Sequence, residues 1–388
     1  MTRVHITGGW YSSRNAGDQA ILISIHELLK ERIPDLVVGV ICANDDFVRR
    51  EHQIDAVSHT KHLGKVLRAV AGSDALLIGG GTPFYDDFKH MCFFWILGLL
   101  TKVSGGKLIV YGASAQKLER MSTRWFTRRI LNLADLVTVR EPLTKTRFEA
   151  LGVRNAIQDT ADPAITLRPC SEARVDEILE REGLADPDRP LFAICPHFFS
   201  NTDPYRVHHY ERFPDDCIER QKRVLAQMAD YLSQIGRPVF VPMNTDPPDS
   251  DVEVQREIAE RTVQRDRIRF IETQYRPREV AGILSRCKLV IGVRLHSLIL
   301  AAAVRTPVLG ISYAPKVAGF MQLIDEADHA FPLQTLEFPN LRDAIDQYLR
   351  DYDRRRERFA QHVAAVQQRA ARNADLVADL LKPERGAR

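Results

Sequence analysis

The stretch GVRLHSLILAAAVRTPVLGISYAPK, residues 292–316, decides the fold. An apolar strand predicted at Leu289–Val293 runs directly into Arg294 and His296, and a helix of small residues follows. A second apolar strand ends shortly before Lys316. In an open parallel sheet, ligands bind outside the carboxyl ends of the strands. Two strands therefore bring Arg, His and Lys to one edge, a set that can hold an anionic substrate and move a proton.

Short apolar runs alternate with helical patterns along almost the whole chain, which is typical of βα units and a parallel sheet. The predicted strands are Arg3–Thr7, Val37–Cys42, Ala75–Ile78, Leu108–Gly112, Leu136–Val139, Leu191–Cys195, Pro238–Pro242, Arg267–Ile271, Leu289–Val293 and Pro307–Ile311. Helices are expected at about 216–235, 252–264 and 277–286, and from about residue 341 a helical pattern continues nearly to the end.

At 388 residues the chain is too long for one ordinary core. Residues 183–190 contain two prolines and three charges and are typical of a linker. We expect an N-terminal α/β domain at 1–185, a C-terminal α/β domain at 186–340 and a helical segment at 341–388. Two successive α/β domains with a terminal helix that crosses back indicate two Rossmann-like domains facing across a cleft, a glycosyltransferase-B-like architecture.

The composition argues against several classes of protein. A net charge of +3 gives no case for a nucleic-acid partner. Six cysteines without CxxC spacing argue against a zinc site or a disulfide framework, and no metal is expected. A strand begins almost at the N-terminus, so we expect no signal peptide and a cytoplasmic location.

The longest apolar run, Met91–Leu100, has about half the residues needed to span a bilayer. It predicts a buried helix. A peripheral contact with the inner face of a membrane is the alternative, since a lipid-linked sugar acceptor would be found there.

The motif that opens this section resembles the C-terminal signature of the polysaccharide pyruvyl transferase family. The usual pattern there is Arg-Leu-His-(Ala/Ser), a small-residue helix, a Pro-Val-apolar-Gly strand and Tyr-Asp-Pro-Lys. Residues 294–297 read Arg-Leu-His-Ser, residues 307–310 read Pro-Val-Leu-Gly, and residues 313–316 read Tyr-Ala-Pro-Lys. The resemblance covers roughly residues 5–325 and implies the same glycosyltransferase-B-like fold. The alternative is a buried strand–helix–strand unit with incidental charges, although core packing requires no Arg-x-His at a strand end.

A glycine-rich loop precedes the first predicted helix. Residues 15–19, Asn-Ala-Gly-Asp-Gln, are similar to the family's Asn-x-Gly-Asp-Glu loop, with Gln19 in place of Glu. The resemblance implies that Asn15 and Gly17 contact substrate and that Asp18 does the proton work. Capping of the following helix is the alternative for Asp18.

Three glycines end another predicted strand. Gly80, Gly81 and Thr82 resemble the family's Gly-Gly-Gly-Ser/Asn segment. The resemblance implies that these residues contact sugar hydroxyls, and that the carboxylates of Asp86 and Asp87 do so as well. A plain tight turn is the alternative. Residues 140–141, Arg-Glu, stand where the family commonly has Arg-Asp, and Arg140 is a weaker candidate for anion binding. His197, after a strand of the second half, is a candidate for substrate contact or a structural histidine.

The resemblance implies a transferase that moves a pyruvyl group from phosphoenolpyruvate to hydroxyls of a sugar-containing acceptor, forming a pyruvate ketal and releasing phosphate. Arg294 and Lys316, with Ser297 beside them, would bind the donor's anionic groups. His296 would be the general acid–base residue and Asp18 its partner. Phosphoenolpyruvate is a co-substrate, and no further cofactor is expected. The acceptor would be a sugar nucleotide, a lipid-linked sugar or another glycosyl compound.

Two other functions stay open. The first is a sugar-nucleotide enzyme of similar fold, a glycosyltransferase or an epimerase. The motif lacks the Glu with which many such enzymes grip the ribose. The second is an inactive binding subunit of a biosynthetic complex, against which the intact Arg, His and Lys set argues.

Overall fold

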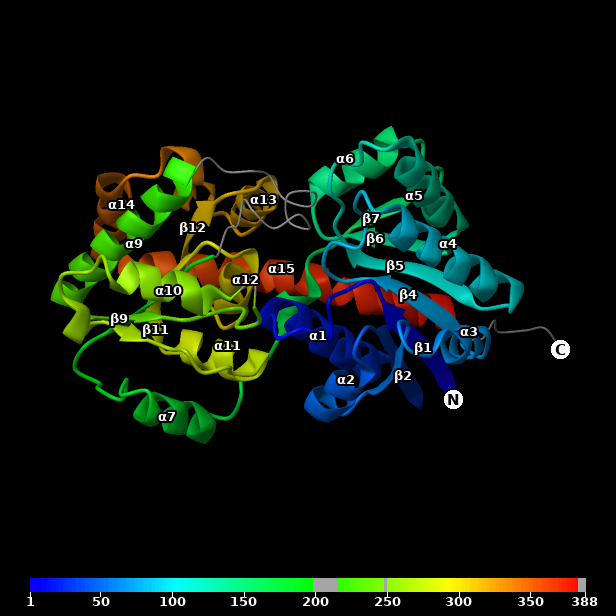
Figure 1. Cartoon of the computed structure of the whole chain (residues 1–388), viewed down its shortest axis with the longest axis horizontal. Coiled ribbons are helices and arrows are strands. Elements are labelled where there is room, and N and C mark those ends of the chain that lie inside the picture. Colours follow the sequence, from blue (N-terminus) through cyan, green and yellow to red (C-terminus); the bar gives the residue numbers. More distant parts are fainter. Residues whose placement is uncertain (198–214, 248–249, 383–388) are drawn as a thin grey trace. The chain divides into compact units, whose positions relative to one another are not determined.

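The structure is a computed structural model that describes residues 1–197, 215–247 and 250–382 (Figure 1). The chain forms two compact units. Unit 1 contains residues 1–13, 21–166 and those from 367 onward, and unit 2 contains residues 14–20 and 167–366. The sequence places a boundary between residues 185 and 186, whereas residues 167–185 cluster with unit 2 in the structure.

The described part of unit 1 contains a seven-stranded parallel sheet with the order β3-β2-β1-β4-β5-β6-β7. Its strands are β1 (Thr2–Thr7), β2 (Leu36–Cys42), β3 (Asp55–Ser58), β4 (Ala75–Gly79), β5 (Lys107–Ala113), β6 (Leu136–Val139) and β7 (Ile157–Asp159). Its helices are α1 (Ala16–Arg32), whose start belongs to unit 2, α2 (Asp45–His52), α3 (Leu63–Ala71), α4 (Phe88–Val103), α5 (Met121–Leu133) and α6 (Pro142–Ala150). The central strands β4 and β5 are almost entirely buried, which explains their continuous apolar sequences.

The described part of unit 2 contains a six-stranded parallel sheet with the order β10-β9-β8-β11-β12-β13. Its strands are β8 (Leu191–Cys195), β9 (Arg237–Phe240), β10 (Arg269–Phe270), β11 (Cys287–Gly292), β12 (Val308–Ser312) and β13 (Ala330–Pro332). Its helices are α7 (Glu172–Arg181), α9 (Asp215–Ile235), α10 (Asp251–Ala259), α11 (Pro277–Ser285), α12 (Leu295–Ala303), α13 (Pro315–Leu323) and α14 (Phe338–Arg350). The order reverses between β8 and β11, as in the Rossmann fold.

The last helix, α15 (Tyr352–Leu381), begins in unit 2 and continues into unit 1 from residue 367. In unit 1 the fully buried side chain of Asn373 fixes it. Asn373 donates to the Ala161 carbonyl at 3.1 Å and accepts from the Thr160 hydroxyl at 2.9 Å. The predicted terminal helix that crosses back is therefore confirmed.

All ten predicted strands are present, with ends shifted by a few residues. Two helix predictions are corrected. The C-terminal segment forms two helices, because Asp351 leaves the helical conformation with φ −116° and ψ 34°. The run at 91–100 lies in α4, but only one face of that helix is buried, and Ile96 and Leu99 are exposed. No helix in the described ranges has the length and hydropathy of a membrane span.

Candidate functional site

Loops that follow four strands of the unit 2 sheet carry the candidate site. Strand β11 pairs in parallel with β8 on one side and with β12 on the other. His197 follows β8, Arg294 follows β11 and Tyr313 follows β12, while Asp251 is the first residue of α10, the helix that follows β9. Since ligands of open α/β sheets bind outside the carboxyl ends of the strands at the point where the order reverses, this edge is the expected place for a substrate.

A buried ion pair joins Arg294 to Asp251. The Nε of Arg294 lies 2.8 Å from each carboxylate oxygen of Asp251. Asp251 is fully buried, and the backbone N–H groups of Met243 and Asn244 each donate to its Oδ2 at 3.0 Å. A buried carboxylate requires partners of this kind, because desolvation otherwise disfavours its charge. Asp251 therefore fixes the orientation of the Arg294 guanidinium.

The same surroundings act in different ways on Asp251 and His197. Burial alone would raise the pKa of Asp251, but the Arg294 charge and the interaction with His197 hold this pKa below its ordinary value. Burial, followed by the Arg294 charge, lowers the pKa of His197 to about 3. His197 is consequently neutral at physiological pH, with its Nδ1 3.9 Å from Oδ1 of Asp251. Positive charge at this edge comes from Arg294 and Lys316 instead.

The rings of Tyr313 and His197 lie between Lys316 and the ion pair of Arg294 and Asp251. Its Nζ lies 5.2 Å from the centroid of the Tyr313 ring, within range of a cation–π interaction. The Tyr313 ring packs against the edge of His197, with the two centroids 5.0 Å apart. A continuous set of contacts thus runs from Lys316 to Asp251 and Arg294. The structure brings together the two predicted anion-binding residues of this unit.

His296 lies against the start of α1, which clusters with unit 2. A Cβ built on Gly17 would lie 2.2 Å from Cγ of His296 and 2.6 Å from its Cβ, far below an ordinary contact. Glycine is therefore required at position 17 by the close approach of the histidine, a reason that the sequence did not reveal.

The loop before α1 is held on the same edge of unit 2. The N–H of Ala16 donates to the Met243 carbonyl at 2.8 Å. Asn15 accepts from the Gly17 N–H through its side chain at 2.9 Å, which is the bond of an N-cap residue. Asp18 follows in the first turn of α1 and is half-buried. Asn15 therefore makes a capping bond at this helix start.

Ser297 has a structural contact at the start of α12. It is fully buried, and its hydroxyl donates to the Arg294 carbonyl at 2.6 Å. This bond closes the turn between β11 and α12, next to Gly292, where a Cβ would lie 2.4 Å from the Ser297 Oγ. The residue therefore supports the backbone from which Arg294 and His296 project.

The predicted site residues of unit 1 form a second set. Arg140, after β6, is buried in an ion pair with Asp162 and also donates to the Thr82 hydroxyl at 3.3 Å. Gly80 and Gly81 precede Thr82 with positive φ angles of 67° and 79°, which favour glycine. A Cβ on Gly80 would also lie 2.2 Å from Ile21. These glycines thus have a conformational role in the turn after β4, beside any contact with substrate.

Asp86 and Asp87 fix helix starts. Asp87 accepts from the His90 N–H at 2.9 Å and caps α4. Asp86 accepts from the Glu119 N–H at 2.6 Å, just before α5. Among the residues that the structure describes, no group of three or more His, Cys, Asp or Glu side chains is placed to hold a metal ion.

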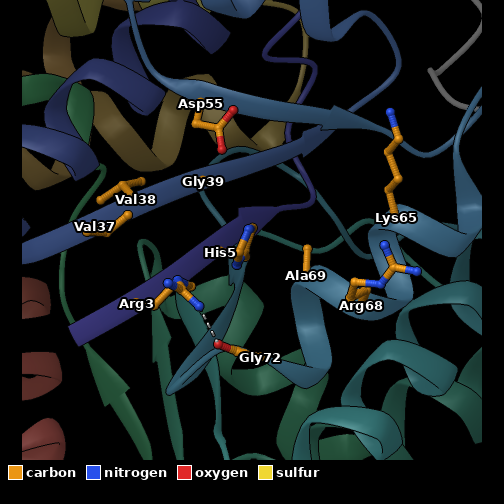
Figure 2. A pocket seen from close by; sticks show the side chains of 10 residues that line it. All are labelled: Arg3, His5, Val37, Val38, Gly39, Asp55, Lys65, Arg68, Ala69 and Gly72. Atoms are coloured by element: carbon orange, nitrogen blue, oxygen red, sulfur yellow. Dashed lines mark hydrogen bonds between the residues drawn. The ribbon is translucent and has the colours of Figure 1, made fainter. Parts of the chain in front are cut away.

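Unit 1 also has a cavity of about 340 Å³ near the amino-terminal ends of β1, β2 and β3, beside α3 (Figure 2). Figure 2 shows Arg3, His5 and Arg68 around it. It lies at the ends of the strands opposite to those where α/β sheets bind ligands. We therefore do not assign it to the candidate site.

The family model of the polysaccharide pyruvyl transferases matches residues 15–315, most of the chain and all the site residues of unit 2 except Lys316. The chain belongs to the polysaccharide pyruvyl transferase family. The chain is 31% identical over 120 residues to the amylovoran biosynthesis protein AmsJ of Erwinia amylovora, a match that spans 31% of this chain and only 28% of AmsJ.

Two solved structures show the same fold at low sequence identity. The UDP-GlcNAc 2-epimerase of Neisseria meningitidis aligns with a TM-score of 0.58 and 11% identity, over 99% of this chain and 100% of that one. The ADP-heptose heptosyltransferase II of E. coli aligns with a TM-score of 0.52 and 13% identity, over 91% of this chain and 100% of that one. The chain therefore has the predicted glycosyltransferase-B-like fold.

Asp251 is a residue of the candidate site that the sequence analysis missed. In the sequence, Asp251 follows a serine and precedes an apolar helical pattern, which predicts only a helix N-cap. Ser250 does cap α10. Asp251 and Arg294 are 43 positions apart in the sequence, so their contact could not be predicted. The analysis of His197 left two roles open, and its contacts with Asp251 and Tyr313 now place it beside the predicted site.

Proposed function

We propose that the transferase moves a pyruvyl group from phosphoenolpyruvate to two hydroxyls of a sugar-containing acceptor, closes a cyclic ketal and releases phosphate. The observation that carries the proposal is the set of Arg294, His296 and Lys316 at the carboxyl edge of one sheet. Contacts through Asp251, His197 and Tyr313 link Arg294 to Lys316. An anion with a phosphate and a carboxylate suits a site with two separate cations.

Arg294 and Lys316 bind the donor in this proposal. Asp251 holds the Nε edge of Arg294, so the plane of the guanidinium is fixed before the anion arrives. Such preorganisation lowers the cost of binding and favours a bidentate contact with phosphate or carboxylate. Lys316 adds a point charge from the neighbouring strand–helix turn.

His296 delivers a proton to the methylene carbon of phosphoenolpyruvate. Protonation makes C2 electrophilic, and a first acceptor hydroxyl adds to C2 and loses its proton. The C2–O bond to phosphate then breaks, phosphate leaves with the electron pair, and the second hydroxyl adds to C2 and loses its proton. One hydroxyl proton replaces the proton that His296 gave, and the other leaves with phosphate. Acid–base catalysis of this kind contributes about 10²–10⁴ in rate.

Asp18 orients or deprotonates the acceptor hydroxyl in the same scheme. It follows Gly17, which lies against the ring of His296, so the two groups belong to adjoining parts of unit 2. In unit 1 we assign sugar hydroxyl contacts to Thr82 and to the backbone of Gly80 and Gly81. Arg140, held by Asp162, positions Thr82.

The acceptor in this proposal is a sugar nucleotide or a lipid-linked sugar, and the protein acts in the cytoplasm, at the inner face of the membrane in the second case. Family membership and the name of AmsJ support an intermediate of polysaccharide assembly.

Ligand-induced shifts in melting temperature test the donor. A ligand that binds only the folded protein raises its melting temperature by mass action. We expect phosphoenolpyruvate to raise it and Arg294→Ala to remove most of this shift, while uridine diphosphate has much less effect. The opposite ranking would favour the sugar-nucleotide enzyme.

A further inference from the structure

Two neighbouring helices of unit 1 expose several large apolar side chains. Helices α4 and α5 pack side by side (Figure 1). Their exposed large apolar side chains are Phe88, Ile96, Leu99, Val103, Met121 and Trp125. Val103 and Met121 are 79% and 78% exposed, so they are hardly covered at all. Soluble monomers seldom display a large apolar patch of this kind without a partner.

The helical positions show that this surface is an ordered stripe. At about 100° per residue, residues 88, 92, 95, 96, 99 and 103 of α4 fall within a sector roughly 100° wide. Met91, Phe94 and Leu97 occupy the opposite face and are buried in the core of the unit. Helix α4 therefore has two apolar faces, of which the sheet needs only one.

Aromatic contacts join the stripe of α4 to α5. Trp95 lies 5.8 Å from Trp125 and 5.8 Å from Phe126, centroid to centroid, and Phe88 lies 5.5 Å from Phe126. The guanidinium of Arg129 lies 5.0 Å from the centroid of the Trp125 ring. Large rigid rings beside arginines suit the boundary between hydrocarbon and water, where one end of a side chain is apolar and the other is wet.

The charged residues within the helices of this face have one sign, while the acidic Asp87 caps α4 and the exposed, acidic Glu119 lies just before α5. Helix α3 packs against the other side of α4 and adds the exposed Leu63 and Leu67. The residues of α3, α4 and α5 include no Asp or Glu, although the chain has 51. They include seven basic residues: Lys65, Arg68, Lys89, Lys102, Arg124, Arg128 and Arg129. Asp135, beyond the end of α5, pairs with Lys102.

We propose that this apolar and basic face of α3, α4 and α5 adsorbs to the surface of an anionic lipid bilayer. Apolar side chains with tryptophan, flanked by arginine and lysine, are the pattern of helices that lie in a membrane interface. Each basic residue near an anionic surface strengthens the attraction, and salt weakens it. The surface is distinct from the candidate site, and the proposal does not depend on pyruvyl transfer.

The test is flotation of the purified full-length protein with vesicles of phosphatidylcholine alone or with one third phosphatidylglycerol. We expect binding to the anionic vesicles that decreases with salt. The triple variant Arg124→Gln, Arg128→Gln, Arg129→Gln should bind roughly 100-fold more weakly, and the corresponding Arg→Lys triple should bind normally. Ile96→Ser with Trp125→Ser should reduce binding at least about tenfold.

The matched control has the same change of charge on exposed arginines of α14 and α15: Arg350→Gln, Arg354→Gln, Arg356→Gln. It should bind anionic vesicles within about threefold of the unmodified protein, because only a general charge effect remains. All variants replace exposed side chains, and their melting temperatures are measured first. The proposal is overturned if the unmodified protein does not float with anionic vesicles, or if both glutamine triples weaken binding equally. It is also overturned if the α4 and α5 variants turn a dimer into a monomer, which would assign the face to a second copy of the chain.

Discussion

Replacement of Gly17 by alanine is the sharpest perturbation that the candidate site offers. The new Cβ would lie 2.2 Å from Cγ, 2.3 Å from Nδ1 and 2.6 Å from Cβ of His296. Because the Cβ of His296 is itself too close, rotation of the imidazole cannot relieve the clash. The start of α1 and the start of α12 must therefore separate.

The distances give the size of the effect. An ordinary contact of a Cβ begins at 3.4 Å, so the two elements must separate by about 1 Å. A misplacement of this size at a catalytic group costs about 10²-fold in rate. Overpacking costs about 1–3 kcal/mol in stability, partly offset by the better helix propensity of alanine. We therefore expect kcat to fall about 100-fold while the protein stays folded.

The assay compares kcat, KM for phosphoenolpyruvate and melting temperature for Gly17→Ala and a control. Gly319→Ala, in α13 of the same unit, is that control, because no atom lies within 4 Å of its added Cβ. It should leave kcat unchanged and stability equal or slightly higher. If folded Gly17→Ala keeps a kcat close to that of the unmodified enzyme, the placement of His296 against α1 has no part in the chemistry.

Four further predictions address single groups. His296→Ala should abolish turnover with little change in donor affinity, since acid–base work is expressed in the transition state, and isothermal titration would separate the two quantities. Asp251→Asn leaves the Arg294 charge without its buried counter-ion, so it should lower the free energy of unfolding by about 3–5 kcal/mol. It should also raise KM for phosphoenolpyruvate more than it lowers kcat. Asp251→Glu should restore part of the stability and part of the donor affinity. Activity should survive chelation by EDTA, and a loss that magnesium restores would point to a metal site near Asp86 and Asp87. The pKa of His197 is lowered to about 3, so below pH 6.5 the unfolded chain takes up a proton that the folded protein does not. The contribution of His197 to the free energy of unfolding is therefore complete above pH 6.5, declines towards pH 3 and is about 2 kcal/mol smaller at pH 5. Urea unfolding of His197→Gln should show a shallower decline of stability with falling pH.

The sequence predicted the central strands because parallel strands buried on both faces are continuous apolar runs. It missed β3, β7 and β13, whose sequences are DAVS, IQD and AFP. All three are too short to give that signal, and the first two are also polar. Helix α4 was predicted to be buried because it is apolar all round, and a composition of that kind does not tell which face meets the core.

In the candidate site, too, the sequence predicted some residues and missed others. Arg294, His296 and Lys316 could be placed from sequence, because each follows a strand end that the apolar pattern reveals. Asp251 could not be predicted from the sequence, since its role depends on a contact with Arg294, which is 43 positions away. The role of Gly17 was also hidden, because the need for glycine arises from the ring of a residue in another element.

One measurement tests the central claim most directly. The purified protein is incubated with phosphoenolpyruvate and a panel of sugar nucleotides and lipid-linked sugars, and both phosphate and acceptor mass are followed, with His296→Ala as the inactive control. We predict release of phosphate in step with an acceptor that gains one pyruvyl ketal. Release of a nucleoside diphosphate without consumption of phosphoenolpyruvate would contradict the account and assign the protein to glycosyl transfer.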